Sequence, residues 1–256
     1  MNLMFFISLS GALISRIPML HSDRPLRVRH LGLMIVIQLL PLSLLQPAGL
    51  WYLSYVIATI GINGALYWVE HRSSIGRDSY RVASFFALVL VYGVLFAPVL
   101  ETGSNPIVIK FLRDSSHYFL PLGFLGDVSA KETVILLTGF LLVTFESNAI
   151  IRHVLSLFDL LPTSKSNADG VEGQPDESEQ AAGRYIGALE RFLLYVFLLN
   201  QAYTAMAFIL AAKSFTRFRA LQKRSFAEYV LIGTLLSASL SVLISLLVLE
   251  LLKASS

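Results

Sequence analysis

The stretch VASFFALVLVYGVLFAPVL, residues 82–100, decides the fold class of this 256-residue chain. It contains no charged residue and no polar stripe that would turn one side of a helix toward water. A helix of this length rises about 28 Å, close to the thickness of the hydrocarbon core of a bilayer. We therefore expect an all-α protein, a polytopic bundle of transmembrane helices.

The rest of the chain repeats this pattern. Hydrophobic residues make up 55% and charged residues 14% of the sequence, whereas soluble domains have about 25% charged residues. Apolar runs alternate with short charged clusters, which predicts six or seven spans. The first ends near Arg16, whose long side chain we expect to reach the interface. The predicted spans are residues 2–17, 31–45, 51–68, 82–100, 133–151, 192–212 and 229–249.

Two segments differ from the spans in composition. Residues 104–126 are too charged for an ordinary span and too apolar for a free loop, and we expect them to be interfacial or re-entrant. The segment PTSKSNADGVEGQPDESEQAAG is polar and predicts a flexible linker. The expected domains are an N-terminal membrane unit (1–161), the linker (162–183) and a C-terminal transmembrane hairpin (184–256).

Polar residues within the predicted spans are candidate functional positions. Asn200 and Gln201 fall near the middle of span 192–212, where an unpaired amide costs several kcal/mol. At least one of them must face another helix, a cavity or its own backbone. Glu146 and Asn148 fall in span 133–151, and with Asn200 and Gln201 they would line a polar path in a transporter.

A stripe of small residues runs along the last predicted span. Small side chains at every fourth position let helix backbones approach closely, and serine hydroxyls can bond across the contact. We expect this stripe to pack on span 192–212, and self-association is the alternative. The helix-packing residues are Gly233, Ser237, Ser241 and Ser245 on the stripe and Ala207 and Ala211 on the other span. A glycine pair in GINGAL (61–66) predicts a further packing site.

Basic residues concentrate in loops, as in topology signals. The loop between the last two spans contains Lys213, Arg217, Arg219, Lys223 and Arg224. We expect it to be cytoplasmic, and binding of anionic lipid headgroups or of a partner protein is the alternative. The net charge of +3 does not indicate nucleic-acid binding. Loops 16–30, 72–81 and 213–224 should all be cytoplasmic, yet three predicted crossings separate the second from the third, so these expectations conflict.

The sequence predicts no catalytic residues, metal site or cofactor. It has no cysteine, and its five histidines are scattered, whereas a metal site needs three or four converging ligands. It also lacks phosphate-loop, dinucleotide and nucleophile-elbow motifs.

Three C-terminal segments resemble the signature of a bacterial membrane-protein family catalogued as a domain of unknown function. They are GRYIGALER (183–191), AFILAAKSFTRF (207–218) and EYVLIGTLLS (228–237). The resemblance implies a multi-pass protein of the bacterial inner membrane. The family often has His and Asp residues in N-terminal helices, as in membrane metal-dependent hydrolases. Its first such motif falls on Ser8 and Ala12 here, which counts against a hydrolase.

These patterns lead to one main functional expectation and two alternatives. The main expectation is a non-enzymatic structural, sensing or partner-binding role in the bilayer, as a homo-oligomer or with another membrane protein. The first alternative is a transporter or channel for a small solute or ion, and the second is a membrane hydrolase that depends on a metal.

Overall fold

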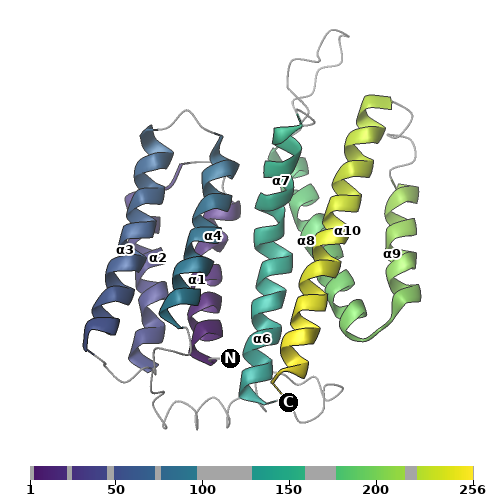
Figure 1. The fold of residues 1–256 in the computed structure, drawn as a ribbon. Helices are drawn as coiled ribbons and strands as arrows, with labels where there is room; N and C mark the ends of the chain where they lie inside the picture. Colours follow the sequence, from purple (N-terminus) through teal and green to yellow (C-terminus); the bar gives the residue numbers. More distant parts are fainter. Residues whose placement is uncertain are drawn as a thin grey trace. The chain divides into compact units, whose positions relative to one another are not determined.

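The computed structural model describes residues 3–21, 25–44, 49–72, 76–96, 129–158, 177–216 and 224–255, and the regular structure in these ranges is helical (Figure 1). The chain divides into two compact units. Unit 1 contains Met1–Leu141 with Glu250–Ser256, and unit 2 contains Leu142–Leu249. This boundary differs from the domain limits expected from the sequence.

Unit 1 is a bundle in which α1 packs against α2, α4 and α6, while α3 packs against α2 and α4. The helix α2 passes into a 3-10 turn that contains Pro41, because proline has no backbone N–H with which to continue an α-helix. A Cβ atom on Gly11 would lie 3.4 Å from Pro41, so α1 approaches this turn closely. The helices are α1 (Leu3–His21), α2 (Val28–Leu39) with its 3-10 turn (Leu40–Leu44), α3 (Gly49–Arg72), α4 (Arg77–Leu95) and α6 (Ala130–Leu141).

The start of α6 is fixed by a capping box. Ser129 Oγ accepts from the backbone N–H of Glu132 at 3.3 Å, and the Glu132 carboxylate accepts from the backbone N–H of Ser129 at 2.7 Å. This exchange satisfies two N–H groups that a helix start leaves open.

Unit 2 begins within the same long helix that contains α6. In this unit α8 packs against α9, α7 and the π-helix. The elements are a π-helix (Leu142–Glu146), α7 (Ser147–Leu157), α8 (Glu177–Leu199), α9 (Tyr203–Thr216) and most of α10 (Arg224–Lys253). Because α8 begins at Glu177, the prediction of a flexible linker is wrong for residues 177–183. Linker residues 162–176 lie outside the described residues.

Five helices in the described ranges are long and apolar enough to cross a membrane. They indicate a membrane-embedded, multi-pass protein, but the predicted number of six or seven spans is not confirmed. Predicted span 31–45 corresponds to a shorter apolar helix, and residues 104–126 lie outside the described residues. The candidate spans are Leu3–Leu20, Tyr52–Arg72, Arg77–Leu95, Lys131–Leu157 and Val230–Lys253.

The prediction of a single span over residues 192–212 is wrong. The helix α8 ends at Leu199 and α9 begins at Tyr203, so the chain reverses at Asn200 and Gln201. Gln201 has a φ of 56°, and the backbone N–H of Ala202 donates to the carbonyl of Phe197 at 2.8 Å. Such bonds satisfy carbonyls at the end of a helix and close the turn.

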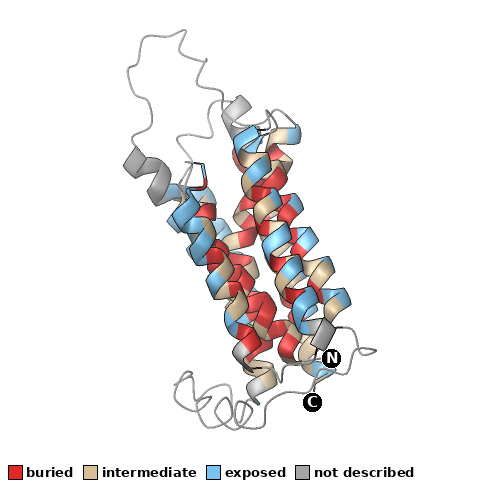
Figure 2. Cartoon of the chain, turned by 90° about the vertical axis from the view of Figure 1, so that its left-hand side faces the viewer, coloured by how far each residue is buried: buried red, intermediate tan, exposed pale blue. Residues whose placement is uncertain are grey.

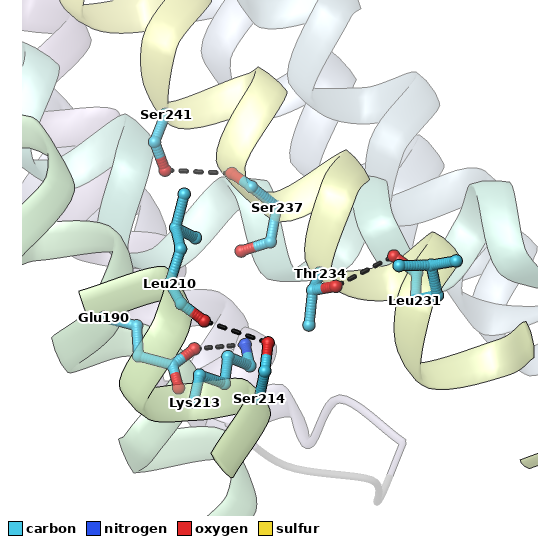
Figure 3. Close-up of polar contacts among 8 residues, drawn as sticks. All are labelled: Glu190, Leu210, Lys213, Ser214, Leu231, Thr234, Ser237 and Ser241. Atoms are coloured by element: carbon cyan, nitrogen blue, oxygen red, sulfur yellow. Dashed lines mark hydrogen bonds and ion pairs between the residues drawn. The ribbon is translucent and has the colours of Figure 1, made fainter. Parts of the chain in front are cut away.

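An ion pair between Glu190 of α8 and Lys213 of α9 joins the two arms of this hairpin (Figure 3). The two residues are 23 positions apart, and both side chains are largely buried. A continuous helix would separate them by about 34 Å, so their contact supports the reversal at residues 200–201.

Candidate functional site

Helix α3 has a polar buried face and an apolar exposed face. Tyr55, Thr59 and Asn63 are at most 1% exposed, and the side chain of Glu70 is fully buried. Their spacing of four, four and seven residues places them on one side of the helix. The residues that α3 exposes include Leu53, Ile57, Ile60 and Trp68. A water-soluble helix has the opposite arrangement, so this pattern supports a lipid environment independently of helix length.

We call the buried residues Tyr55, Thr59, Asn63 and Glu70, together with the side chains that contact them, the polar column. From Tyr55 to Glu70 the helix rises about 22 Å, so the column extends through much of the bundle. Figure 2 shows buried residues concentrated on the inward faces of the helices and exposed residues on their outer faces.

One end of the polar column is charged. Glu70 Oε1 lies 3.1 Å from Arg81 Nη2, and both side chains are at most 1% exposed. Arg16 donates from Nη1 to Ser84 Oγ at 2.9 Å and from Nη2 to the backbone carbonyl of Arg81 at 2.7 Å. These contacts join α1, α3 and α4. The prediction that Arg16 reaches the interface is wrong, because this residue is 1% exposed within the bundle.

An amide pair forms the middle of the polar column. Asn63 Nδ2 donates to Gln38 Oε1 at 2.7 Å, and Gln38 Nε2 donates to Asn63 Oδ1 at 3.4 Å. Gln38 Nε2 also donates to Ser15 Oγ at 2.8 Å. Because Gln38 belongs to α2 and Ser15 to α1, these side chains bind three helices together.

Two tyrosines form the other end of the polar column. The hydroxyl of Tyr55 donates to the backbone carbonyl of Gln38 at 2.8 Å. The ring of Tyr55 stacks on that of Tyr92 with centroids 5.2 Å apart. The Tyr92 hydroxyl lies 3.5 Å from Thr59 Oγ1. This layer connects α2, α3 and α4 through both aromatic and polar contacts.

Unit 2 has a separate buried polar cluster at its π-helix. Glu146 is 1% and Arg191 3% exposed. Arg191 of α8 donates to the backbone carbonyls of Val143 and Thr144 at 2.9 and 3.0 Å. Glu146 is a candidate from the sequence, whereas Arg191 is not, because it directly precedes predicted span 192–212 and has the position of a charge at a span border.

The other polar residues predicted in the membrane have different surroundings. Asn200 and Gln201 are exposed in the turn between α8 and α9. Asn200 Nδ2 donates to the carbonyl of Val196 at 2.8 Å, so its amide binds its own backbone. Asn148 is half-buried on α7. The structure therefore does not bring Asn200 and Gln201 into a buried path.

The small-residue stripe is buried along α10. Ser237, Ser241 and Ser245 are at most 7% exposed, and Gly233 is half-buried. A Cβ on Gly233 would lie 3.9 Å from Leu155 of α7. Ser241 Oγ donates to the Ser237 carbonyl at 2.9 Å (Figure 3), and Ser245 Oγ donates to the Ser241 carbonyl at 2.7 Å. These hydroxyls bind their own helix rather than a neighbour.

The alanines expected opposite this stripe are not placed against it. Ala207 and Ala211 are exposed on α9, whereas the neighbour identified at Gly233 belongs to α7. The serines are buried, but the helix-packing role of the stripe stays a prediction, and the neighbour identified at Gly233 belongs to another helix than the predicted one.

The predicted basic interface is described only in part. Lys213 pairs with Glu190, so it serves as an intramolecular contact. Arg224 is the first residue of α10. Arg217, Arg219 and Lys223 lie outside the described residues.

Within the described ranges, no group of three or more His, Asp or Glu side chains is close enough to hold a metal ion. His30 and His71 are exposed, and His71 Nδ1 lies 2.9 Å from the carbonyl of Tyr67. Comparison of the chain with family models, curated proteins and solved structures finds no match. Among the described residues, the polar column and the cluster at the π-helix are two candidate sites.

Proposed function

We propose that the protein is a multi-pass protein of a bacterial inner membrane that moves a small polar solute or ion along the polar column of unit 1. The inverted polarity of α3 carries this proposal. Polar and ionisable side chains inside a membrane are costly, and they commonly mark substrate pathways, ion pathways or proton relays. The bacterial inner membrane is supported by the resemblance of the C-terminal segments alone.

The chemistry of the column suits a solute that leaves water. Amides, hydroxyls and guanidinium groups can replace the hydrogen bonds that such a solute loses. Glu70 Oε2 is buried and has no hydrogen-bond partner among the described residues, which leaves an acceptor available at the charged end. The arrangement supports transport better than catalysis, because the column is long and its polar groups are spread along it.

A second candidate is the non-enzymatic structural role expected from the sequence. The reciprocal bonds between Gln38 and Asn63 favour it, because each amide satisfies the other. Buried polar pairs of this kind can fix the register of neighbouring helices without any transported ligand. The two roles differ in what happens when the pair is replaced by apolar side chains.

The test uses the purified full chain in proteoliposomes and a panel of protons, monovalent anions, monovalent cations and small neutral polar solutes. The variant Gln38→Leu/Asn63→Leu replaces the amide pair by an apolar pair. We expect the unaltered protein to move at least one solute and the folded double variant to lose at least nine-tenths of that flux. Equal flux in the two proteins, or flux of every solute equal to that of protein-free liposomes, would contradict transport through the column.

A matched control separates loss of flux from general damage. Leu53 and Ile57 lie on the exposed face of α3, and the double change Leu53→Ile/Ile57→Leu alters that face without touching the column. We expect it to retain full flux. The thermal midpoint of each variant, measured in the same detergent, shows whether it is folded before reconstitution.

A further inference from the structure

The long helix over residues 130–157 changes its hydrogen-bonding pattern near its middle. The segment Leu142–Glu146 is a π-helix between α6 and α7. In a π-helix each backbone bond spans five residues instead of four, and single turns of this kind often occur at functional positions. The corresponding candidate span, Lys131–Leu157, has 27 residues, several more than the roughly 20 that a bilayer requires.

Three consecutive carbonyls of the π-helix accept hydrogen bonds from side chains. The Leu142 carbonyl accepts from Ser147 Oγ at 3.0 Å. Those of Val143 and Thr144 accept from Nε and Nη2 of Arg191 at 2.9 and 3.0 Å. In a regular α-helix each of these carbonyls would be engaged by the N–H four residues later. Arg191 therefore stabilises the π form, because conversion to α-helix would make its two acceptors compete with backbone donors.

The π-helix also stands at a division in the chain. The boundary between the two compact units falls between Leu141 and Leu142, where the π-helix begins. A change in helical form at this place alters the direction of every side chain that follows relative to those that precede it. One residue of α-helix corresponds to about 100° of rotation and 1.5 Å of rise.

We infer that Leu142–Glu146 is a two-state joint, held in its π form by Arg191. Release of Arg191 converts the segment to α-helix and turns α7 by the equivalent of one residue relative to α6. Glu146, the buried last residue of the segment, changes its direction in the same step. Helix shifts of this size are known elements of conformational switches. This inference does not depend on transport through the polar column.

The conversion has a defined geometric signature within a single helix. The five residues of the π-helix advance by about one residue less of rotation than five residues of α-helix. After conversion, Ser156 therefore occupies the place relative to α6 that Leu157 has now. Two spin-label pairs are compared. The distance for Leu137→Cys/Leu157→Cys in the otherwise unaltered chain is the distance expected for Leu137→Cys/Ser156→Cys after the conversion.

The experiment measures these label pairs by pulsed electron spin resonance on the full chain, which has no native cysteine. We expect Arg191→Gln to move the 137/156 distance distribution onto that of the 137/157 reference. Arg184→Gln, two turns earlier on α8, is the matched control and should leave the distribution unchanged. A second control deletes Thr144. A single π turn accommodates one extra residue, so without Thr144 the segment can be regular α-helix while α6 and α7 keep their present register. Arg191→Gln should then leave the distance distribution unchanged.

An unchanged 137/156 distribution in folded Arg191→Gln protein would overturn the inference. If this variant does not fold, Arg191→Lys is measured instead. The lysine keeps the charge but replaces the two fixed donors by one amine, so we expect a mixture of both distances. A single unaltered distance for Arg191→Lys would show that the π-helix is fixed by its own sequence and not by Arg191.

Discussion

Buried polar side chains have different partners in the polar column of unit 1 and along α10 of unit 2. In the polar column of unit 1 they bind across helices, as Gln38 of α2 does with Asn63 of α3. On α10 of unit 2 they bind their own backbone, as Ser241 does with the carbonyl of Ser237. A residue satisfied by its own helix can be replaced without leaving another side chain unpaired, whereas a residue shared between helices cannot. Equal burial therefore has unequal consequences.

The turn at residues 200–201 tests most directly whether a polar side chain binds its own backbone. The expected result is the largest of the predictions, because a cysteine is either labelled or protected. If Asn200 binds its own backbone and the chain reverses there, the outer ends of α8 and α9 face the same side of the membrane. Gly183 and Ser214 are exposed near these ends. In sealed vesicles of one orientation, we expect an impermeant thiol reagent to label Gly183→Cys and Ser214→Cys alike.

A single span through this region would give the opposite outcome, with one cysteine labelled and the other protected. A permeant reagent applied to both variants controls for intrinsic reactivity. The hairpin also bears on the conflict between the basic loops. Two crossings instead of three then separate loop 72–81 from loop 213–224, so both can lie in the cytoplasm without a crossing by residues 104–126.

Arg81 should show the largest loss of stability among substitutions in the polar column. Arg81→Leu leaves the Glu70 carboxylate buried without its cation, and breaking a buried ion pair costs about 3–5 kcal/mol. The Arg16 bond to the backbone carbonyl at position 81 can remain. We expect a clearly lower free energy of unfolding, measured by denaturant titration in detergent micelles.

Arg77→Leu is the matched control, because Arg77 is exposed one turn earlier on α4. Its expected change is within about 0.5 kcal/mol. The double variant Glu70→Leu/Arg81→Leu should recover most of the loss, since no unpaired charge remains. A loss for Arg81→Leu no larger than that for Arg77→Leu would mean that the ion pair does not stabilise the bundle.

Asn63 should show an intermediate effect. Asn63→Leu leaves Gln38 Oε1 without its donor and Gln38 Nε2 without one of its acceptors, which costs about 1–3 kcal/mol. Ala65→Leu adds an apolar side chain at an exposed position of the same helix and should change the free energy of unfolding far less. If both substitutions have the same effect, the amide pair contributes nothing specific to the packing of α2 on α3.

The all-helical class and the burial of the α10 stripe follow from patterns within short segments. Uncharged apolar runs have a length that matches a bilayer, and Gly233, Ser237, Ser241 and Ser245 recur at every fourth residue. Both patterns lie within one short segment of the chain, so they can be recognised from a single sequence. The spacing of Tyr55, Thr59 and Asn63 is an equally local pattern, whereas the glycine pair in GINGAL predicts packing at Gly61 and Gly64 instead. An added Cβ on either glycine would meet nothing within 4 Å.

Other features depend on contacts between distant segments and could not be predicted in this way. Arg16 and Arg191 look like charges at span borders, and only the neighbouring helices make them buried donors. The reversal at Gln201 was also hidden, because the turn uses a left-handed glutamine where a glycine would be the usual signal. Uncharged sequence on both sides of it has the length and composition of one continuous span.

The smallest expected effect comes from a pair of identical substitutions, Ser15→Ala and Ser241→Ala. Both serines are at most 2% exposed, and both donate to a carbonyl of their own helix. They differ because Ser15 Oγ also accepts from Gln38 Nε2 at 2.8 Å. Losing that bond between helices should cost about 0.6 kcal/mol, the average measured for side-chain bonds inside membranes. Ser241→Ala removes no such bond, so its free energy of unfolding should stay near that of the unaltered chain. A loss for Ser241→Ala as large as that for Ser15→Ala would show that the serine hydroxyls of α10 do bind a neighbouring helix, and the distinction between the polar column and α10 would then fail.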